Sequence, residues 1–266
     1  MFLKAAGPTL VKKVAEILQP RRIPVMPLKG VLLQKLVYRE ESFRPIVDVD
    51  LLVPEAQFLD ACAELRRAGF TEECWEVGRW QVTLRNPAGP PLGVDLHRRI
   101  ARTSRARLTP TGMFQRGTMD TQLFGAPVVL PSADDLFAHL LLHATLHWIS
   151  LGRLHRTRDF EAVARSLALD TDRCAEHLVD QGLLTHALVM LPMIAADTGG
   201  PFVHELESRL PRKARGRLAA ALVRQITARF GVGQPVRRLA GLALAPSLSA
   251  ALVSAALDRL DLRQRV

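Results

Sequence analysis

The sequence predicts an α+β fold, in which a small mixed sheet with flanking helices is followed by a helical C-terminal domain. Up to about residue 131, short apolar runs rich in β-branched residues alternate with amphipathic helical patterns, which is typical of strands connected by helices and turns. From Ser132 onward nearly every segment has helical spacing, and glycines or prolines separate the segments. We therefore expect two domains, residues 1–131 and residues 132–266.

In the N-terminal region the expected elements follow one another closely. The helix that begins at Pro54 has acid in its first turn and arginines in its last, as the helix dipole favours, and it stops at Gly69. The turn Asn86–Pro91 leads into a strand at residues 93–97, and Pro110–Gly112 has the composition of a loop. Further helices are expected at residues 8–19 and from Gly30, and further strands at residues 23–28, 47–53, 72–77, 80–85 and 126–130.

The C-terminal region begins with a helix start signal, because Ser132 and Asp135 have the spacing of a capping box. Glycines at several positions then divide the rest of the region into helical segments. Helices are expected after residue 132 and at residues 157–168, 171–181, 183–197, 202–209, 211–230 and 246–260.

The apolar strand at residues 47–53 carries two aspartates, Asp48 and Asp50, which point to the same side because residues two apart share a face. Two like charges repel, and a buried carboxylate without a partner is costly. A divalent cation would keep both ionised, and carboxylate oxygens suit Mg²⁺ or Mn²⁺, with phosphates often completing the Mg²⁺ shell. The strand therefore indicates phosphate chemistry. The alternative is that one aspartate lies in water and the other caps a turn.

Two neighbouring segments favour the phosphate interpretation. Upstream, Lys29 and Gly30 lie where a short apolar run meets a helix, so that a glycine, free helix N–H groups and an ammonium group come together. Downstream, Asp95 and His97 share a face of the next predicted strand. A third carboxylate is what a two-metal site requires, or a general base beside the metal.

These segments resemble a known family. The series Leu28-Lys29-Gly30, Arg44-Pro45, Asp48-Val49-Asp50-Leu51-Leu52-Val53 and Val94-Asp95-Leu96-His97 is similar to the uncharacterised nucleotidyltransferase family of the polymerase-β-like superfamily. The motifs cover residues 20–100, and the histidine-containing helix after residue 132 is also similar. Two features depart from the broader superfamily pattern: Val31 follows Gly30 where many members have serine, and the spacing from Gly30 to Asp48 is longer.

The resemblance implies a polymerase-β-like core and a metal-dependent transfer of a nucleoside monophosphate from an NTP to a hydroxyl acceptor on a small molecule, peptide or RNA. The catalytic and metal-binding residues would be Asp48, Asp50 and Asp95, with Mg²⁺ or Mn²⁺ as cofactor. The residues expected to bind the nucleotide are Lys29, Gly30, Arg44, His97, His143 and His147. Arg44 would contact a phosphate bidentately, and the alternative is a salt bridge to Glu40 or Glu41.

Three histidines, His139, His143 and His147, are four residues apart and share one stripe of the predicted helix. Two of them could bind zinc, but no carboxylate or cysteine completes a set nearby, so packing within the helix face is the plainer interpretation. The family resemblance favours a third interpretation, in which His143 and His147 contact the nucleotide or the acceptor.

Composition narrows the environment. A net charge of +10 favours anionic partners, including nucleic acid, although aromatic residues make up only 5% and are not interleaved with the basic stretches. Three cysteines without metal-type spacing indicate a reducing compartment. The longest apolar stretch is too short for a membrane span, so a cytoplasmic location is expected.

Two alternative functions stay open on the sequence. The same metal site could transfer the γ-phosphoryl group, as a kinase does, because the choice between α- and γ-phosphate depends on where the acceptor lies. Alternatively, the chain could be a basic nucleic-acid-binding module without catalysis, whose acids are structural. Such a module would bind nucleic acid in a strongly salt-dependent way.

Overall fold

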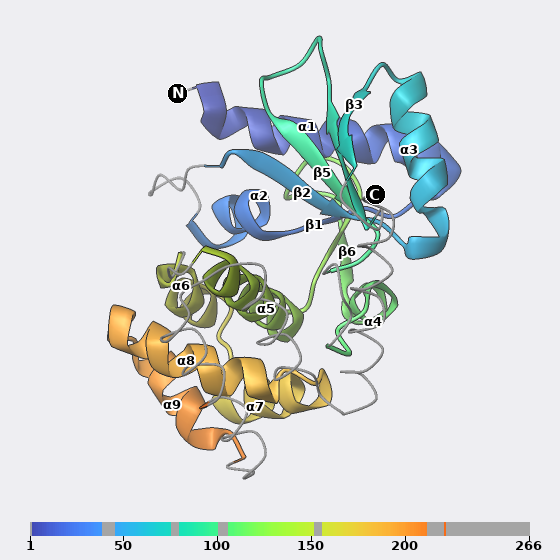
Figure 1. Cartoon of the computed structure of the whole chain (residues 1–266). Coiled ribbons are helices and arrows are strands. Elements are labelled where there is room, and N and C mark those ends of the chain that lie inside the picture. The colour runs from blue at the N-terminus through green and yellow to red at the C-terminus, as the bar shows by residue number, and fades with distance from the viewer. Residues whose placement is uncertain are drawn as a thin grey trace, which may run out of the picture. The chain divides into compact units, whose positions relative to one another are not determined.

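The computed structural model describes residues 2–38, 46–75, 80–100, 106–151 and 156–211, together with residue 221. The chain forms two compact units (Figure 1). Unit 1 comprises Met1–Arg102 and Thr109–Ser132, and unit 2 comprises Thr103–Leu108 and Ala133–Val266. The short segment at residues 103–108 thus interrupts unit 1. The helices expected at 211–230 and 246–260, and the position of Arg44, lie outside the described residues.

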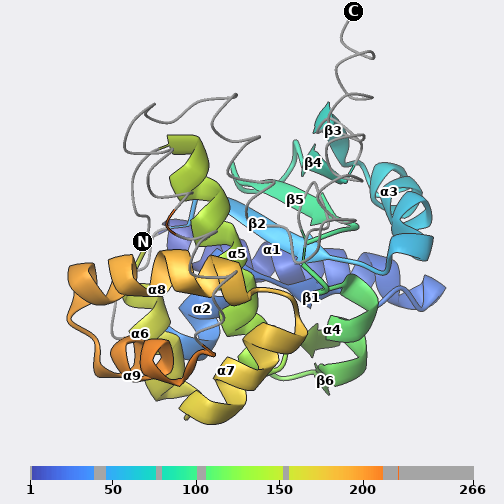
Figure 2. The ribbon, with the colours of Figure 1, turned by 60° about the horizontal axis from the view of Figure 1, so that its bottom comes forward.

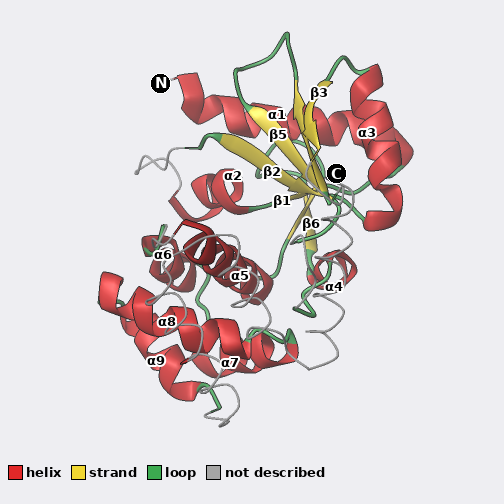
Figure 3. Ribbon diagram, in the orientation of Figure 1, coloured by secondary structure: helices red, strands yellow, loops and turns green. Residues whose placement is uncertain are grey.

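Unit 1 is built around a five-stranded mixed sheet, as the sequence predicted (Figure 3). The strands are β1 (Met26–Pro27), β2 (Asp48–Leu52), β3 (Thr71–Trp75), β4 (Gln81–Arg85) and β5 (Gly93–His97). Their order is β1-β2-β5-β4-β3, and β2 and β5 pair in parallel while the other pairs are antiparallel. The central position therefore belongs to β5, which places it beside the Asp-x-Asp strand.

On one face of this sheet, the three central strands carry only apolar side chains. Alternate residues of the three central strands lie on it and are fully buried, namely Val49, Leu51, Val82, Leu84, Val94 and Leu96. Helix α1 (Phe2–Leu18) contacts β2, and α3 (Phe58–Arg67) packs on α1; Figure 2 shows α1 running along the sheet. Burying each such side chain stabilises the fold by about 1.5–3 kcal/mol. The polar residues of the same strands must consequently lie on the opposite face.

The remaining elements of unit 1 are short. A 3₁₀ turn η1 (Gln19–Arg21) follows α1, and η3 (Glu55–Gln57) precedes α3. Helix α2 (Lys29–Leu33) follows β1 directly and continues as a π-helical turn η2 (Gln34–Tyr38). The second sheet is a hairpin of β6 (Thr118–Asp120) and β7 (Val128–Leu130). A hydrogen bond from Val129 N–H to Val25 O, at 2.8 Å, ties this hairpin to the chain just before β1.

The loop predicted at Pro110–Gly112 is wrong, because these residues begin helix α4 (Pro110–Arg116). The side chain of Thr109 accepts a hydrogen bond from Gly112 N–H at 3.2 Å, so Thr109 is the N-cap. Pro110 occupies the first helical position, where a missing N–H and a fixed φ are compatible with a helix. Residues that look like loop formers thus act here as a helix start signal.

Unit 2 is helical throughout its described part. Its helices are α5 (Ala133–Leu151), α6 (Arg158–Ser166), α7 (Thr171–Asp180), α8 (Leu184–Thr198) and α9 (Pro201–Arg209). Helix α5 contacts α6, α7 and α8, so it forms the centre of the unit. The segment at 103–108 joins this unit through Arg107, whose N–H donates to Gln181 O at 2.7 Å. Among the described helices of the whole chain, none combines the length and the apolarity that crossing a bilayer requires.

Candidate functional site

The polar face of the sheet gathers the three acids and one of the histidines that the sequence singled out. In the parallel pair of β2 and β5, Asp50 lies opposite Asp95, and Leu52 lies opposite His97. Residues paired in this way point to the same face, and Asp48 shares that face because it is two residues from Asp50. The register therefore brings together three carboxylates that are separated by up to 47 positions in the chain.

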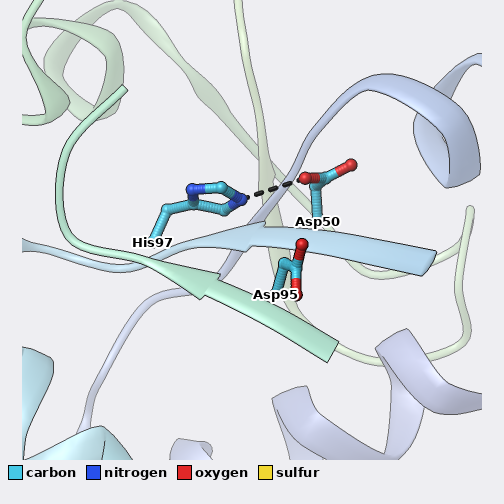
Figure 4. A group of neighbouring side chains, drawn as sticks. All are labelled: Asp50, Asp95 and His97. Carbon is cyan, nitrogen blue, oxygen red and sulfur yellow. Dashed lines mark hydrogen bonds and ion pairs between the residues drawn. The ribbon is translucent and has the colours of Figure 1, made fainter. Parts of the chain in front are cut away.

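Asp50, Asp95 and His97 form a compact cluster (Figure 4). One ligand atom from each, a carboxylate oxygen or an imidazole nitrogen, lies within 4.8 Å of the others. The Nε2 atom of His97 is 3.0 Å from Oδ1 of Asp50. Carboxylate oxygens are the ligands that suit Mg²⁺ or Mn²⁺, so the two acids of this cluster fit the metal that the sequence implied.

Asp50 is the most strongly compensated of the three acids. Its side chain is only 5% exposed, and its Oδ1 atom lies 2.7 Å from Nζ of Lys29 as well as next to His97. Burial by itself would raise the pKa of Asp50, but the ammonium group of Lys29 and the imidazole of His97 outweigh it and hold the pKa well below its usual range. Asp50 is therefore ionised at neutral pH.

Asp48 has the opposite electrostatic situation. Within the described part of the chain its carboxylate has neither a hydrogen bond nor an ion pair. Burial and the neighbouring Asp50 carboxylate raise the pKa of Asp48, with a smaller contribution from Asp95, while Lys29 and His97 act against the rise. A half-buried carboxylate held beside two others is the position at which an additional cation would relieve the most repulsion.

Asp95 is oriented by a residue that sequence reasoning missed. Thr83 lies directly opposite it in β4, and the Thr83 hydroxyl donates to Oδ1 of Asp95 at 2.7 Å. The strand at 80–85 was expected, but its pairing with the Asp95 strand is a long-range contact that the local pattern does not show. The hydrogen bond fixes one oxygen of Asp95 and leaves the other to face a ligand.

Lys29 and Gly30 lie at the start of α2, next to β2. The N–H of Leu28 donates to the carbonyl oxygen of Asp50 at 3.0 Å, which fixes this corner against the strand. Lys29 itself has a left-handed backbone conformation, with φ of 43°. For a residue with a Cβ atom this costs about 1–2 kcal/mol. The sequence predicted a contact between Lys29 and phosphate but not its ion pair with Asp50.

A tryptophan borders the cluster. The rings of Trp80 and His97 have their centroids 5.4 Å apart and are tilted by 43°. The Nε1 atom of Trp80 is buried and has no hydrogen-bond partner among the described residues.

The other residues predicted to contact the nucleotide are not among the three that form the cluster of Asp50, Asp95 and His97. Arg44 lies outside the described residues. His143 and His147 belong to α5 in unit 2, with ring centroids 4.2 Å apart, and the His139 ring is 6.4 Å from that of His143. The three histidines do form a stripe along the helix, and contact of His143 and His147 with a nucleotide stays a prediction.

The acids that the sequence resemblance singled out lie together on the central strands of the sheet. The chain belongs to the family described as uncharacterised nucleotidyltransferases, whose model matches residues 9–198 and thus most of the sequence. It is accordingly a transferase of the nucleotidyltransferase class. No curated protein matches the chain significantly.

Several solved structures are similar to the chain at low sequence identity. The solution structure of the antibiotic-resistance factor ANT(2'')-Ia is 14% identical, with 84% of this chain and 98% of that chain covered and a TM-score of 0.46. The crystal structure of ANT(2'')-Ia with adenylyl-2''-tobramycin is also 14% identical, covers 65% and 94%, and has a TM-score of 0.45. A tRNA-processing enzyme is 13% identical, covers 90% and 70%, and has a TM-score of 0.28.

Proposed function

We propose that the protein transfers a nucleoside monophosphate from an NTP to a hydroxyl acceptor, with the help of a divalent cation. The observation that carries this proposal is the register of β2 and β5, which sets Asp50 beside Asp95 and places Asp48 on the same face, where it has no ion pair with any described residue. The catalytic role is assigned to residues 1–131, and residues 132–266 are proposed as the helical domain that accompanies them.

The three acids would hold Mg²⁺ or Mn²⁺. Asp50 has one carboxylate oxygen engaged by Lys29 and His97, so its second oxygen is the one oriented for a cation. Asp95 would share that cation through the oxygen that Thr83 holds, which leaves its other oxygen unused. When bound, the cation neutralises phosphate charge and polarises the phosphoryl group that is attacked. Asp48 would gain the most from such a partner, because its carboxylate is repelled by Asp50 and Asp95.

The chain's own residues would then position the substrates and move one proton. Lys29, Gly30 and Arg44 would bind the phosphates, while His97, His143 and His147 would contact the nucleotide. The acceptor oxygen would form a bond to the α-phosphorus, and the bond between that phosphorus and the pyrophosphate oxygen would break. The free oxygen of Asp95, oriented by Thr83, would take the proton of the acceptor hydroxyl. Catalysis would rest on positioning and charge neutralisation.

The acceptor is proposed to be a hydroxyl of a small molecule, peptide or RNA, and the protein is proposed to work in the cytoplasm. Two thiols support a reducing environment, because Cys62 and Cys174 are free and buried. The net charge of +10 would also favour an anionic acceptor.

The test uses NTPs labelled in parallel at the α- or the γ-phosphate. Each is incubated with Mg²⁺ or Mn²⁺, the purified protein and an extract of cells as the source of acceptor. The double variant Asp48→Asn/Asp50→Asn is compared with Asp60→Asn, which removes an exposed carboxylate from α3 in the same unit. We expect transfer of the α-label by the wild type and by Asp60→Asn, and none by the double variant.

Two outcomes would contradict the proposal. Transfer of the γ-label alone would make the protein a phosphotransferase that uses the same site. Salt-dependent nucleic-acid binding that is unaffected by the double variant, together with no label transfer, would favour the basic binding module.

A further inference from the structure

The position next to the most buried acid is already taken by a cation that belongs to the protein. Nζ of Lys29 lies 2.7 Å from Oδ1 of Asp50, and the Lys29 side chain is 16% exposed. His97 Nε2 approaches the same oxygen at 3.0 Å. Oδ1 of Asp50 thus has two nitrogen partners that the protein itself supplies.

The backbone holds Lys29 in this place. The hydrogen bond from Leu28 N–H to Asp50 O ties the residue before Lys29 to the strand that carries the acid. The left-handed φ of 43° at Lys29 then departs from the ordinary path of the chain into α2. A conformation that costs about 1–2 kcal/mol persists only when its surroundings compensate for it, and the Asp50 ion pair is a compensating contact.

The ammonium group also changes the charge that a metal ion would meet. The acids Asp48, Asp50 and Asp95 carry three negative charges, and Lys29 reduces the sum to minus two when His97 is neutral. Its charge also acts on Asp48, where it opposes part of the rise in pKa that burial and the Asp50 carboxylate cause. A positive charge among the metal ligands weakens their attraction for a divalent cation. Lys29 is therefore both a partner of Asp50 and a competitor of the metal.

An NTP offers Lys29 a different partner. Its triphosphate is strongly anionic and would lie at the start of α2, where Lys29 and Gly30 are found. If the ammonium group turns from Asp50 to a phosphate oxygen, its ion pair is replaced rather than lost, and the negative charge of Asp50 that it had offset then attracts the metal in full.

We propose that Lys29 exchanges partners, serving as the counter-ion of Asp50 before substrate binds and as a phosphate ligand afterwards, so that it suppresses metal binding in the absence of NTP. This inference rests on the proposed function. It makes Lys29 one source of cooperativity between metal and nucleotide, and linkage requires each to improve the binding of the other by the same factor. Coupling between two ligands typically amounts to about 5–150-fold.

The experiment measures Mn²⁺ binding by the electron paramagnetic resonance of free Mn²⁺, with and without an α,β-methylene NTP analogue that resists transfer. The variant Lys29→Gln removes the charge but keeps an N–H donor for Asp50, so the fold is spared. The matched control is Lys35→Gln, which removes an exposed charge from the following helical turn. Lys29→Met is the second variant, because methionine also has an unbranched side chain and meets the same cost of the left-handed backbone conformation.

In the absence of nucleotide, we expect both Lys29 variants to bind Mn²⁺ about tenfold more tightly than the wild type does. We expect the same variants to bind the nucleotide analogue about tenfold more weakly. Both changes lie within the usual range of coupling. Lys35→Gln should match the wild type in both measurements. Unchanged or weaker Mn²⁺ binding by both Lys29 variants would overturn the inference while leaving the proposed function intact. A wild type that takes up no Mn²⁺ even with the analogue would refute the proposed function itself.

Discussion

Substitution of Asp48 by asparagine should stabilise the metal-free protein while it abolishes nucleotidyl transfer. The carboxylate of Asp48 is half-buried, and the neighbouring Asp50 and Asp95 carboxylates repel it. Asparagine has nearly the same shape and no charge, so the substitution removes the repulsion without creating a cavity. A gain in stability at a residue needed for activity is the usual consequence of charges arranged for function rather than for folding.

The size of the gain follows from the strand geometry. Residues i and i+2 of a strand are about 7 Å apart. Two unit charges at that distance repel by roughly 0.6 kcal/mol in water and roughly 2.4 kcal/mol at an effective dielectric constant of about 20. Lys29 offsets part of this repulsion. We expect the free energy of unfolding to rise by about 0.5–2 kcal/mol, which corresponds to a Tm increase of roughly 1–8 °C.

The gain in stability from Asp48→Asn should increase as the pH rises. The raised pKa of Asp48 means that the folded state holds this proton more tightly than the unfolded chain does. By linkage, stability falls as the pH rises from about 3.9, the value for an unfolded aspartate, through the folded pKa. The penalty is complete at neutral pH, so the advantage of Asp48→Asn is greatest there and shrinks as the pH falls toward about 4.

Calorimetric unfolding in EDTA measures the effect, and Asp50→Asn is the matched variant on the same strand. The Asp50→Asn substitution removes the charged acceptor of Lys29 and His97. It should lower the stability, because hydrogen bonds to charged groups are worth about 1.5–3 kcal/mol. The two variants should therefore shift the Tm in opposite directions. A Tm decrease for Asp48→Asn similar to that for Asp50→Asn would refute the electrostatic reasoning about this face.

Two further predictions concern Thr83 and the buried thiols. Thr83→Val keeps the β-branched shape but removes the hydroxyl that orients Asp95, so steady-state kinetics should show kcat lowered by about 10–100-fold with the KM for NTP little changed, and Thr83→Ser should restore most of the activity. Burial raises the pKa of Cys62 to about 11 and that of Cys174 to about 12. Both thiols should therefore resist alkylation by iodoacetamide at pH 8 in the native protein. Mass spectrometry that finds either cysteine alkylated before the protein is unfolded would contradict this prediction.

The central strands could be predicted from the sequence because their local patterns are strong. Val49 and Leu51 alternate with Asp48 and Asp50, and a period of two is the signature of a strand with one buried face. Helix α4 could not be recognised, because Thr109 and Pro110 act as cap and first residue only when the following segment has a surface to pack on. Local composition alone does not distinguish these residues from a loop.

The site was harder to predict than the strands that carry it. That Asp50 lies beside Asp95, and Thr83 beside Asp95, depends on strand order and register, which arise from pairing between distant segments. The prediction from the sequence put Lys29 beside a phosphate because it concerned the protein with its substrate bound. Without a ligand, the buried charge of Asp50 attracts the nearest cation, and that cation is Lys29.

The interruption of unit 1 by residues 103–108 has a consequence for how the chain is synthesised. Ala106 and Leu108 are buried, and Arg107 bonds to Gln181, yet they leave the ribosome well before the helices of unit 2. The last part of unit 1, including the β7 hairpin, emerges after them. The N-terminal half therefore completes its fold while carrying a hexapeptide whose Ala106 and Leu108 have no partner yet. A cut at residue 131 would keep that hexapeptide permanently from its unit, so a stable C-terminal fragment must be supplied with residues 103–108.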